Sequence, residues 1–260
     1  MAALEKPGPK ERMRAGEVLL GTFIQTPHPV ICEFLGGLGF DLLCVEAEHS
    51  AMGAETIQSL VSACDLAGID SLVRIADNDW RLVAGALDAG AAGVICPRVN
   101  SAAELEALVR SALYPPVGER GIGPGRVTSY GYNSGPDYRE RANARNLVAA
   151  QVETKEAVSN LDDIVRVDGL DMVFVGPADL ASSLGLDGMD DPRLGATIDR
   201  ILETVQAAGK LTGIFAGNSR SAAQWISKGA RFVLLASDLM FMEGGATAAL
   251  GELEKLRADK

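Results

Sequence analysis

Short apolar runs recur along the chain and alternate with segments in which apolar residues have a helical spacing. An uninterrupted apolar run of roughly four to eight residues is typical of a strand buried on both faces, as in a parallel sheet. Eight such runs are present, at residues 18–24, 42–45, 71–74, 93–97, 147–153, 172–176, 212–215 and 232–236. We interpret them as eight strands.

The intervening segments predict helices, most clearly at residues 54–67, 80–89, 102–113 and 196–208. Glycine precedes several of the apolar runs, where a left-handed residue can close the last turn of a helix: Gly39, Gly68, Gly90, Gly169, Gly209 and Gly229. Eight alternations in 260 residues favour an α/β fold of the (β/α)8 TIM barrel type over an open doubly wound sheet. The expected first turn also has no G-x-G-x-x-G. We find no domain boundary and expect a single domain over residues 1–260.

Two segments depart from this alternation of strands and helices. Residues 114–146 contain a run rich in glycine and proline, which predicts a long loop rather than a regular helix. Loops of this length are usually functional or part of an interface. The tail after Ala246 predicts a final amphipathic helix.

Charge and cysteine spacing exclude several classes of protein. The chain has 24 Lys and Arg against 35 Asp and Glu, a net charge of −11, which argues against binding to nucleic acid or to an anionic membrane. No apolar run approaches the roughly 20 residues of a membrane span, and the N-terminal residues are unlike a signal peptide, so we expect a cytoplasmic protein. The four cysteines lack metal-ligand spacing and are interpreted as small buried hydrophobes: Cys32, Cys44, Cys64 and Cys96.

Polar residues follow four of the predicted strands. In a barrel, the C-terminal ends of all strands meet at one face, where the chemistry of such folds is found. The residues at these ends are Glu46, Glu48 and His49, then Arg74, then Gln151 and Glu153, and finally residues 176–179, which include Asp179. We therefore predict a functional site at this face.

Each of these residues also has a purely structural interpretation. Glu153 could be half of a salt bridge, Asp179 could cap a helix that starts at Leu180, Arg74 could neutralise Glu46 or Glu48, and His49 could be a satisfied, partly buried histidine. Convergence at one face favours function, because uncompensated buried charges are costly.

The chemistry that this set suggests is metal-assisted. Two carboxylates together with water suit a hard divalent ion, Mg²⁺ or Mn²⁺, rather than zinc. Such an ion can bind a 2-oxo acid and act as the Lewis acid for its enolate, while Arg74 adds positive charge and His49 carries a proton. Backbone N–H groups after Gly176 could receive the substrate carboxylate. None of the eight runs ends in Lys, which argues against a Schiff base.

The same residues lie within motifs that resemble the HpcH/HpaI family of class II, metal-dependent pyruvate aldolases. The matching motifs are Val-Glu-Ala-Glu-His, Leu-Val-Arg, Leu-Asp-Ala-Gly-Ala, Tyr-Pro-Pro-Val-Gly-Glu-Arg-Gly, Gln-Val-Glu-Thr and Val-Gly-Pro-Ala-Asp-Leu. They occur in order from about Gly21 to Asp238, and the last two are the most specific. The family often has Asp where this chain has Glu46, and Arg98 is a further difference.

The resemblance implies a role for individual residues. It implies that Glu153 and Asp179 bind the divalent metal (Mg²⁺, Mn²⁺ or Co²⁺), that His49 is the base and that Arg74 stabilises the transition state. Substrate contacts are implied for Gln151, Ala178 and Asp179, and Asp88 matches a carboxylate that raises the basicity of the histidine. A homohexamer of barrels with exchanged C-terminal helices is also implied.

Asp88 is unusual because it is predicted in the last turn of a helix, where the helix dipole disfavours a carboxylate by roughly 0.3–1 kcal/mol. That helix runs away from the face that carries the site. Our hypothesis is that Asp88 acts on His49 of a neighbouring subunit; the alternative is a solvated surface residue.

The expected activity is reversible cleavage of a 4-hydroxy-2-oxo acid to pyruvate, or a related 2-oxo acid, and an aldehyde. One alternative is a citrate-synthase-like enzyme or acyl-CoA lyase that uses a thioester, with residues 120–126 lining a groove for the nucleotide carrier. Another is a non-catalytic protein that binds 2-oxo acids.

Overall fold

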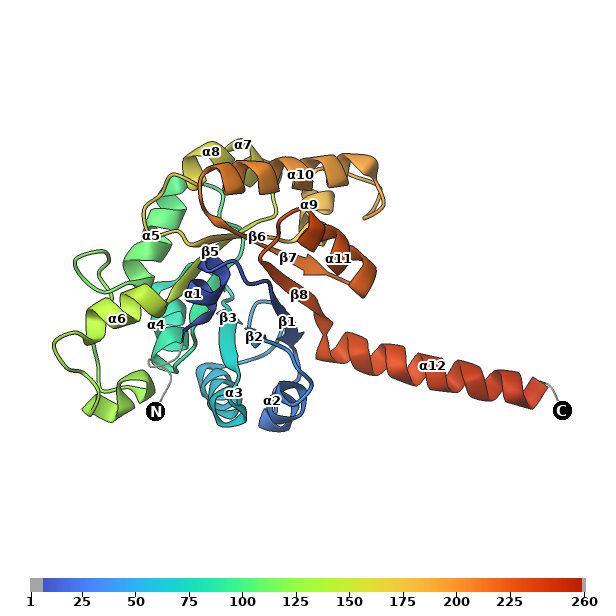
Figure 1. Cartoon of the computed structure of the whole chain (residues 1–260), viewed down its shortest axis with the longest axis horizontal. Coiled ribbons are helices and arrows are strands. Elements are labelled where there is room, and N and C mark those ends of the chain that lie inside the picture. Colours follow the sequence, from blue (N-terminus) through green and yellow to red (C-terminus); the bar gives the residue numbers. More distant parts are fainter. Residues whose placement is uncertain (1–6, 259–260) are drawn as a thin grey trace.

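Eight parallel strands form a closed barrel in the computed structural model, which describes residues 7–258 (Figure 1). Each strand pairs with its neighbours in sequence, and β8 closes on β1. The strands are β1 (Leu19–Ile24), β2 (Leu42–Glu46), β3 (Asp70–Arg74), β4 (Gly93–Cys96), β5 (Leu147–Val152), β6 (Met172–Val175), β7 (Leu211–Ala216) and β8 (Phe232–Ser237). This confirms the TIM barrel, with every strand at a predicted position.

Alternation along the strands separates two hydrophobic cores. Because successive side chains point to opposite faces, Leu42 and Cys44 pack inside the barrel, while Leu43 and Val45 pack outward against the helices. The same alternation assigns the next position, Glu46, to the inner face. Counting in steps of two assigns the other predicted strand-end residues to that face as well: Arg74, Gln151, Glu153 and Gly176.

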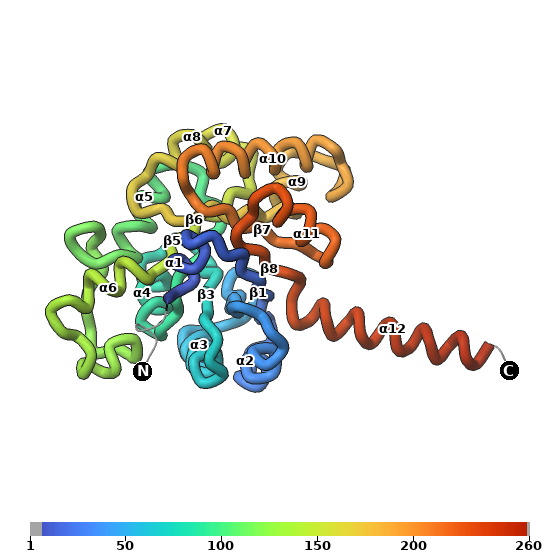
Figure 2. Tube along the Cα trace, in the orientation of Figure 1, coloured from blue at the N-terminus to red at the C-terminus, as the bar shows by residue number. Residues whose placement is uncertain are grey.

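The outer layer of helices surrounds this barrel (Figures 1 and 2). Its members are α2 (Pro29–Gly36), α3 (Ala54–Ala67), α4 (Trp80–Asp88), α5 (Ala102–Ala112), α7 (Lys155–Ser159), α8 (Leu161–Ile164), α9 (Pro177–Ser183), α10 (Pro192–Ala207) and α11 (Ser219–Ser227). All six glycines that were expected to close a helix have positive φ angles, as the sequence predicted. All four cysteines are buried and free, which confirms their interpretation as small hydrophobes.

Residues 114–146 contain more structure than the sequence predicted. A short 3-10 element, η1 (Arg126–Gly131), and a two-turn helix, α6 (Tyr138–Arg145), lie within the segment expected to be a loop. The helix was missed because it is rich in arginine and has few apolar residues to mark a buried face. Only Tyr138 and Ala142 of α6 are buried.

The two terminal helices differ in how they relate to the barrel. Helix α1 (Pro9–Arg14) packs at the N-terminal ends of the strands, where Lys10 and Arg14 bind Asp171. Helix α12 (Asp238–Ala258) projects away from the barrel (Figure 1). It begins at Asp238 rather than near Ala246, which corrects the sequence expectation.

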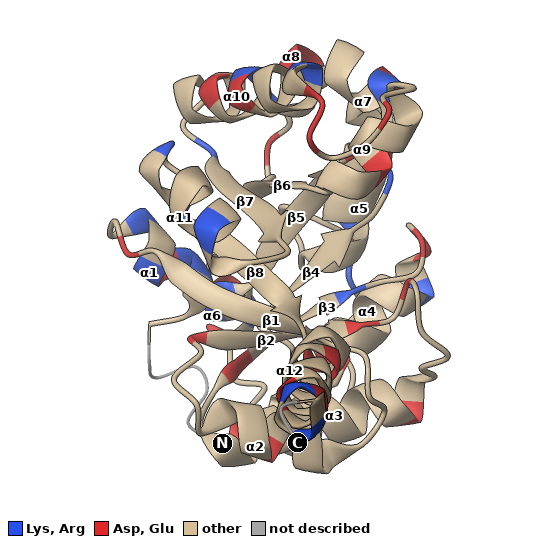
Figure 3. Cartoon of the chain, turned by 90° about the vertical axis from the view of Figure 1, so that its right-hand side faces the viewer, with Lys and Arg blue, Asp and Glu red and all other residues tan. Residues whose placement is uncertain are grey.

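Charged side chains of both signs occur on the helices and loops, while the strands are largely uncharged (Figure 3). No helix within residues 7–258 is both long enough and apolar enough to cross a bilayer.

Candidate functional site

A pocket of about 190 Å³ opens at the C-terminal ends of the strands. Its lining includes most of the residues that the sequence singled out, namely Glu46, His49, Arg74, Gly176, Ala178 and Asp179. Residues that are more than 100 positions apart therefore share one cavity, as the barrel topology predicted.

Glu153 and Gln151 lie buried beside this pocket, with 2% and 0% of their surface exposed. The Gln151 side-chain amide donates to Glu153 Oε2, and the backbone N–H of Arg98 donates to Oε1 at 2.8 Å. Burial raises the pKa of Glu153, and the nearby Asp179 charge acts in the same direction, whereas the two hydrogen bonds oppose the shift. Among the described residues Glu153 makes no ion pair, so the salt-bridge interpretation is wrong.

Glu46 connects the arginine of the site to the loop that carries the histidine. Its carboxylate, fully buried, accepts from Arg74 Nε at 2.6 Å and also from Nη2. The other oxygen accepts the backbone N–H groups of Glu48 and His49, at 2.8 and 2.9 Å. Arg74 therefore does pair with Glu46, as the structural interpretation proposed, and that pairing also fixes its orientation in the pocket.

His49 is more than half exposed, with 58% of its side-chain surface accessible. It is therefore not a satisfied core histidine. Its Nε2 lies 3.8 Å from Glu48 Oε2, which is also 3.4 Å from Arg74 Nε. Burial raises the pKa of Glu48. The sequence had placed Glu48 among the strand-end residues without a role of its own, and the structure places its carboxylate beside the histidine.

Asp179 lies in the first turn of α9, which begins at Pro177 after an N-cap at Gly176. The helix therefore does not start at Leu180, and Asp179 is not its cap. A Cβ atom added at Gly176 would lie 2.7 Å from Glu153 Oε2, so the glycine leaves the space that the Glu153 carboxylate occupies.

The donor set fits a hard divalent cation. Two buried oxygen acceptors beside the pocket, Glu48 Oε2 and Gln151 Oε1, have no hydrogen-bond partner. Glu153 and Asp179 lie close enough for their charges to interact. No group of three or more His, Cys, Asp and Glu side chains within residues 7–258 is placed to hold a metal. A cation held by the two carboxylates Glu153 and Asp179 would keep positions for substrate and water, as Mg²⁺ commonly does.

Asp88 is not part of this pocket. It ends α4, as predicted, and its Oδ1 accepts from Arg120 Nη2 at 2.5 Å. Since α4 runs antiparallel to the strands, Asp88 lies toward the opposite end of its own barrel. The structure therefore does not bring Asp88 and His49 together within one chain.

Sequence reasoning missed the apolar wall of the pocket, formed by Phe23, Phe174, Phe215 and Met240. The guanidinium of Arg74 stacks on Phe23, 4.4 Å from the ring centroid. Alternation along β1 assigns Phe23 to the inner face and would have identified it. Met240 belongs to α12, and no local signal brings that helix to the pocket.

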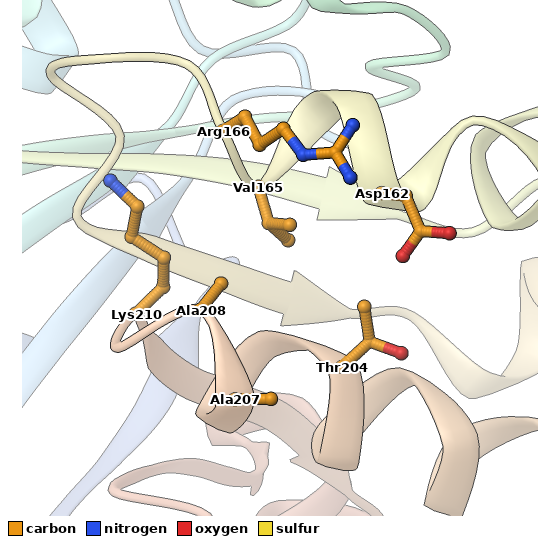
Figure 4. Close-up of a pocket in the computed structure, with 7 residues that line it drawn as sticks. All are labelled: Asp162, Val165, Arg166, Thr204, Ala207, Ala208 and Lys210. Atoms are coloured by element: carbon orange, nitrogen blue, oxygen red, sulfur yellow. The ribbon is translucent and has the colours of Figure 1, made fainter.

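Another hollow, of about 590 Å³, lies between α8 and the end of α10 (Figure 4). Two of its three charged lining residues are already engaged: Lys210 Nζ donates to backbone carbonyls, and Arg166 pairs with Asp163. None of the strand-end residues lines it, so the candidate site remains the pocket at the strand ends.

Comparison with known proteins agrees with this geometry. The family described as HpcH/HpaI aldolase/citrate lyase matches residues 19–243. The chain belongs to this family. Its HpcH/HpaI relatives include the 4-hydroxy-2-oxo-heptane-1,7-dioate aldolase of Salmonella dublin, which is 35% identical over 240 residues, 92% of this chain and 91% of the relative. These relatives identify the protein as a carbon–carbon lyase.

Two solved structures superpose closely on the chain. The HpcH/HpaI aldolase from Desulfitobacterium hafniense DCB-2 has a TM-score of 0.90 at 28% identity and covers 96% of this chain and 97% of its own. The citrate synthase SbnG has a TM-score of 0.88 at 30% identity, covering 98% and 100%. The chain is thus similar in structure both to an aldolase and to a citrate synthase.

Proposed function

We propose that this lyase is a divalent-metal-dependent aldolase that reversibly cleaves a 4-hydroxy-2-oxo acid to pyruvate, or a related 2-oxo acid, and an aldehyde. The observation that supports it most directly is the buried Glu153, which is held by two hydrogen bonds and lies near Asp179 and near two buried oxygen atoms that make no hydrogen bond. A carboxylate buried in this way, with no ion pair to any residue between positions 7 and 258, is costly.

Glu153 and Asp179 are the residues that would hold the cation. When bound, Mg²⁺ or Mn²⁺, with Co²⁺ as a further option, would polarise the ketone oxygen of the 2-oxo acid. Gln151 and the backbone at Gly176, Ala178 and Asp179 would orient the substrate carboxylate, because the first amides of a helix have no partner within it.

His49 and Arg74 would carry the proton and charge steps. In cleavage, His49 takes the proton of the C4 hydroxyl through a water molecule. The C3–C4 bond breaks, its electron pair enters the enolate of the 2-oxo acid, and the aldehyde leaves. Arg74 stabilises the negative charge on the enolate oxygen. Protonation of C3 then yields pyruvate.

Exchange of the pyruvate methyl protons with D₂O, followed by NMR, tests this proposal without knowledge of the aldehyde. Exchange should require Mg²⁺ or Mn²⁺ and stop in EDTA. Exchange that persists in EDTA would contradict the role of the metal. No exchange with any divalent ion would contradict enolate formation and favour a protein that only binds 2-oxo acids.

A thioester-dependent activity is the second candidate, because a citrate synthase is 30% identical to this chain. The structure does have a groove, of about 550 Å³, lined by Arg120 and Arg126. However, both arginines pair with aspartates, and the groove also borders Gly90, close to the N-terminal end of β4. It therefore lies far from the pocket of its own chain. Turnover of oxaloacetate with acetyl-CoA would favour this candidate over the aldolase.

We further propose that the chain forms a homo-oligomer, a hexamer by its resemblance to the family, in which α12 is exchanged between subunits. Apolar side chains are exposed along α12, on α2 and in the turn after α2, including Leu250, Leu253, Leu256, Phe34 and Leu38. Exposed apolar patches of this kind indicate interaction surfaces. The double variant Leu253→Lys/Leu256→Lys should dissociate the assembly in light scattering; an unchanged mass would contradict the exchange.

In such an assembly Asp88 would act on His49 of a neighbouring subunit. Asp88→Asn should then lower turnover and move its pH profile, because the histidine loses an anionic partner. An unchanged rate and profile would leave Asp88 as a partner of Arg120 alone.

A further inference from the structure

The residue that follows β4 and Pro97 has an unusual backbone conformation. Arg98 has a φ angle of 51°, in the left-handed region that non-glycine residues seldom occupy. Its side chain is exposed and makes no hydrogen bond or ion pair with the described residues. The conformation is therefore not explained by anything that the guanidinium binds.

The backbone of Arg98 does have a partner. Its N–H donates to Glu153 Oε1 at 2.8 Å, and the next N–H, of Val99, donates to the carbonyl oxygen of Gln151 at 3.3 Å. Two successive amides thus bind the end of β5. A residue in the extended conformation at position 98 would direct these amides to opposite sides, so the left-handed turn is what brings both to the same strand.

Glu153 is constrained from the other directions as well. The Gln151 amide binds its second oxygen, and the missing Cβ of Gly176 leaves the space that this oxygen occupies. Of these constraints, the Arg98 amide is the one that requires an unfavourable backbone. Strain of this kind is unfavourable, persists only where the surrounding structure enforces it, and is concentrated at functional sites.

We propose that Arg98 is a positioning residue whose strained backbone, rather than its side chain, holds Glu153 in the orientation that binds the divalent cation. This inference rests on the proposed function for the identity of the bound ion. Because the inference concerns the backbone amide of Arg98, it predicts that the metal affinity of a variant depends on how well the new residue tolerates the left-handed conformation. The charge of the new side chain should have no effect.

The affinity of the full-length chain for Mn²⁺, measured by calorimetry on a series of Arg98 variants, tests this dependence on backbone conformation. Arg98→Gly and Arg98→Asn remove the positively charged guanidinium, but both residues tolerate a positive φ. Both variants should therefore bind Mn²⁺ within about twofold of the wild type. Arg98→Val strongly disfavours a positive φ. It should weaken binding by about 10- to 100-fold, the usual effect of losing a group that orients a metal ligand.

Tyr130 provides a matched control, since its φ angle of 56° is equally left-handed and none of its hydrogen bonds reaches Glu153. Tyr130→Val should lower the melting temperature and leave Mn²⁺ affinity unchanged. Equal affinity of Arg98→Val and the wild type would overturn the proposal. So would a loss of affinity in Arg98→Asn as large as in Arg98→Val, since it would assign the effect to the guanidinium.

A measurement without metal separates this inference from the proposed function. In EDTA, Arg98→Val should lower the melting temperature less in a Glu153→Gln background than in the wild type. The hydrogen bond from the Arg98 N–H to a neutral glutamine is weaker than the bond to the Glu153 carboxylate, so its loss costs less stability. Equal decreases in the two backgrounds would overturn the proposal. A wild type that shows this coupling but binds no Mn²⁺ would contradict the metal-dependent function while retaining the role of Arg98.

Discussion

Both ends of the barrel carry buried carboxylates, but the two ends differ in how completely these groups are bound by partners within the chain. At the N-terminal ends of the strands, Asp171 binds Lys10 at 2.9 Å and Arg14 at 2.7 Å, and its second oxygen accepts the backbone N–H of Val148. Asp41 is likewise bound by Arg12 and by the backbone N–H of Leu20. These carboxylates are fully satisfied within the chain and close the base of the barrel.

At the C-terminal ends, the acceptors are incompletely paired. Glu48 Oε2 and Gln151 Oε1 are buried without a hydrogen bond, and burial raises the pKa of both Glu48 and Glu153. A single arginine, Arg74, serves two carboxylates there. The contrast indicates that the paired residues at the base of the barrel stabilise the fold, whereas the incompletely paired acceptors at the other end are available to the cation and substrate of the proposed function.

The largest expected effect is on chemistry at the incompletely paired end. Glu153→Gln should reduce metal-dependent exchange of pyruvate protons by at least about 10³-fold, because a lost metal ligand removes several kcal/mol of stabilisation. The free energy of unfolding in EDTA should not fall, since a buried charge is removed. Glu156→Gln, at an exposed position, is the control. If Glu153→Gln retained metal-dependent proton exchange, the assignment of function to the C-terminal ends of the strands would be contradicted.

The next effect should appear at the base and leave the chemistry intact. Asp171→Asn should lower the free energy of unfolding by about 3 kcal/mol, because it leaves the buried Lys10 without its anion. Exchange per folded molecule should be unchanged. Asp163→Asn breaks the exposed pair with Arg166 and should cost less than about 1 kcal/mol. Equal losses of stability in chemical denaturation would contradict the structural role of the base.

A smaller effect should distinguish aldehyde partners. The Salmonella dublin relative is named for a diacid, whose cleavage between C3 and C4 releases a four-carbon aldehyde with a carboxylate. The described lining of the pocket here contains one arginine, already paired, and four large apolar side chains. Burying a carboxylate against them is costly, so butanal should be used about tenfold more efficiently than succinic semialdehyde. The reverse preference would indicate a cation supplied by another subunit.

The smallest effect should be a pH dependence of stability. Burial raises the pKa of Glu153 in the folded state above its value in the unfolded chain, about 4.3. The contribution of the protonated Glu153 to the free energy of unfolding is therefore fully present below the unfolded pKa. It is lost as pH rises through the folded pKa, since the unfolded state releases the proton first. In EDTA, the stability advantage of Glu153→Gln over the wild type should therefore grow from about pH 4 toward neutrality. An advantage that is constant with pH would contradict the raised pKa.

Much of this architecture is determined by local sequence. Apolar runs separated by helical spacing predicted all eight strands, and the position of glycine before several of these runs predicted the left-handed closures that the structure shows. The strand-end position of Glu46, Arg74 and Glu153 predicted one shared site, because a parallel barrel brings all C-terminal strand ends to one face. Helix α6 escaped prediction because its arginine-rich sequence has little apolar periodicity.

The tertiary structure alone decided how the charged residues are partnered. The sequence offered both Glu46 and Glu48 as partners of Arg74, but nothing local indicates that Glu46 would also bind the backbone at His49. Nor does anything local indicate that Asp88 would pair with Arg120, or that Arg98 would direct an amide at Glu153. Hydrophobic spacing is a property of neighbouring residues and can be read along the chain. Pairing and desolvation depend on distances between residues far apart in sequence, so they exist only once the barrel has closed.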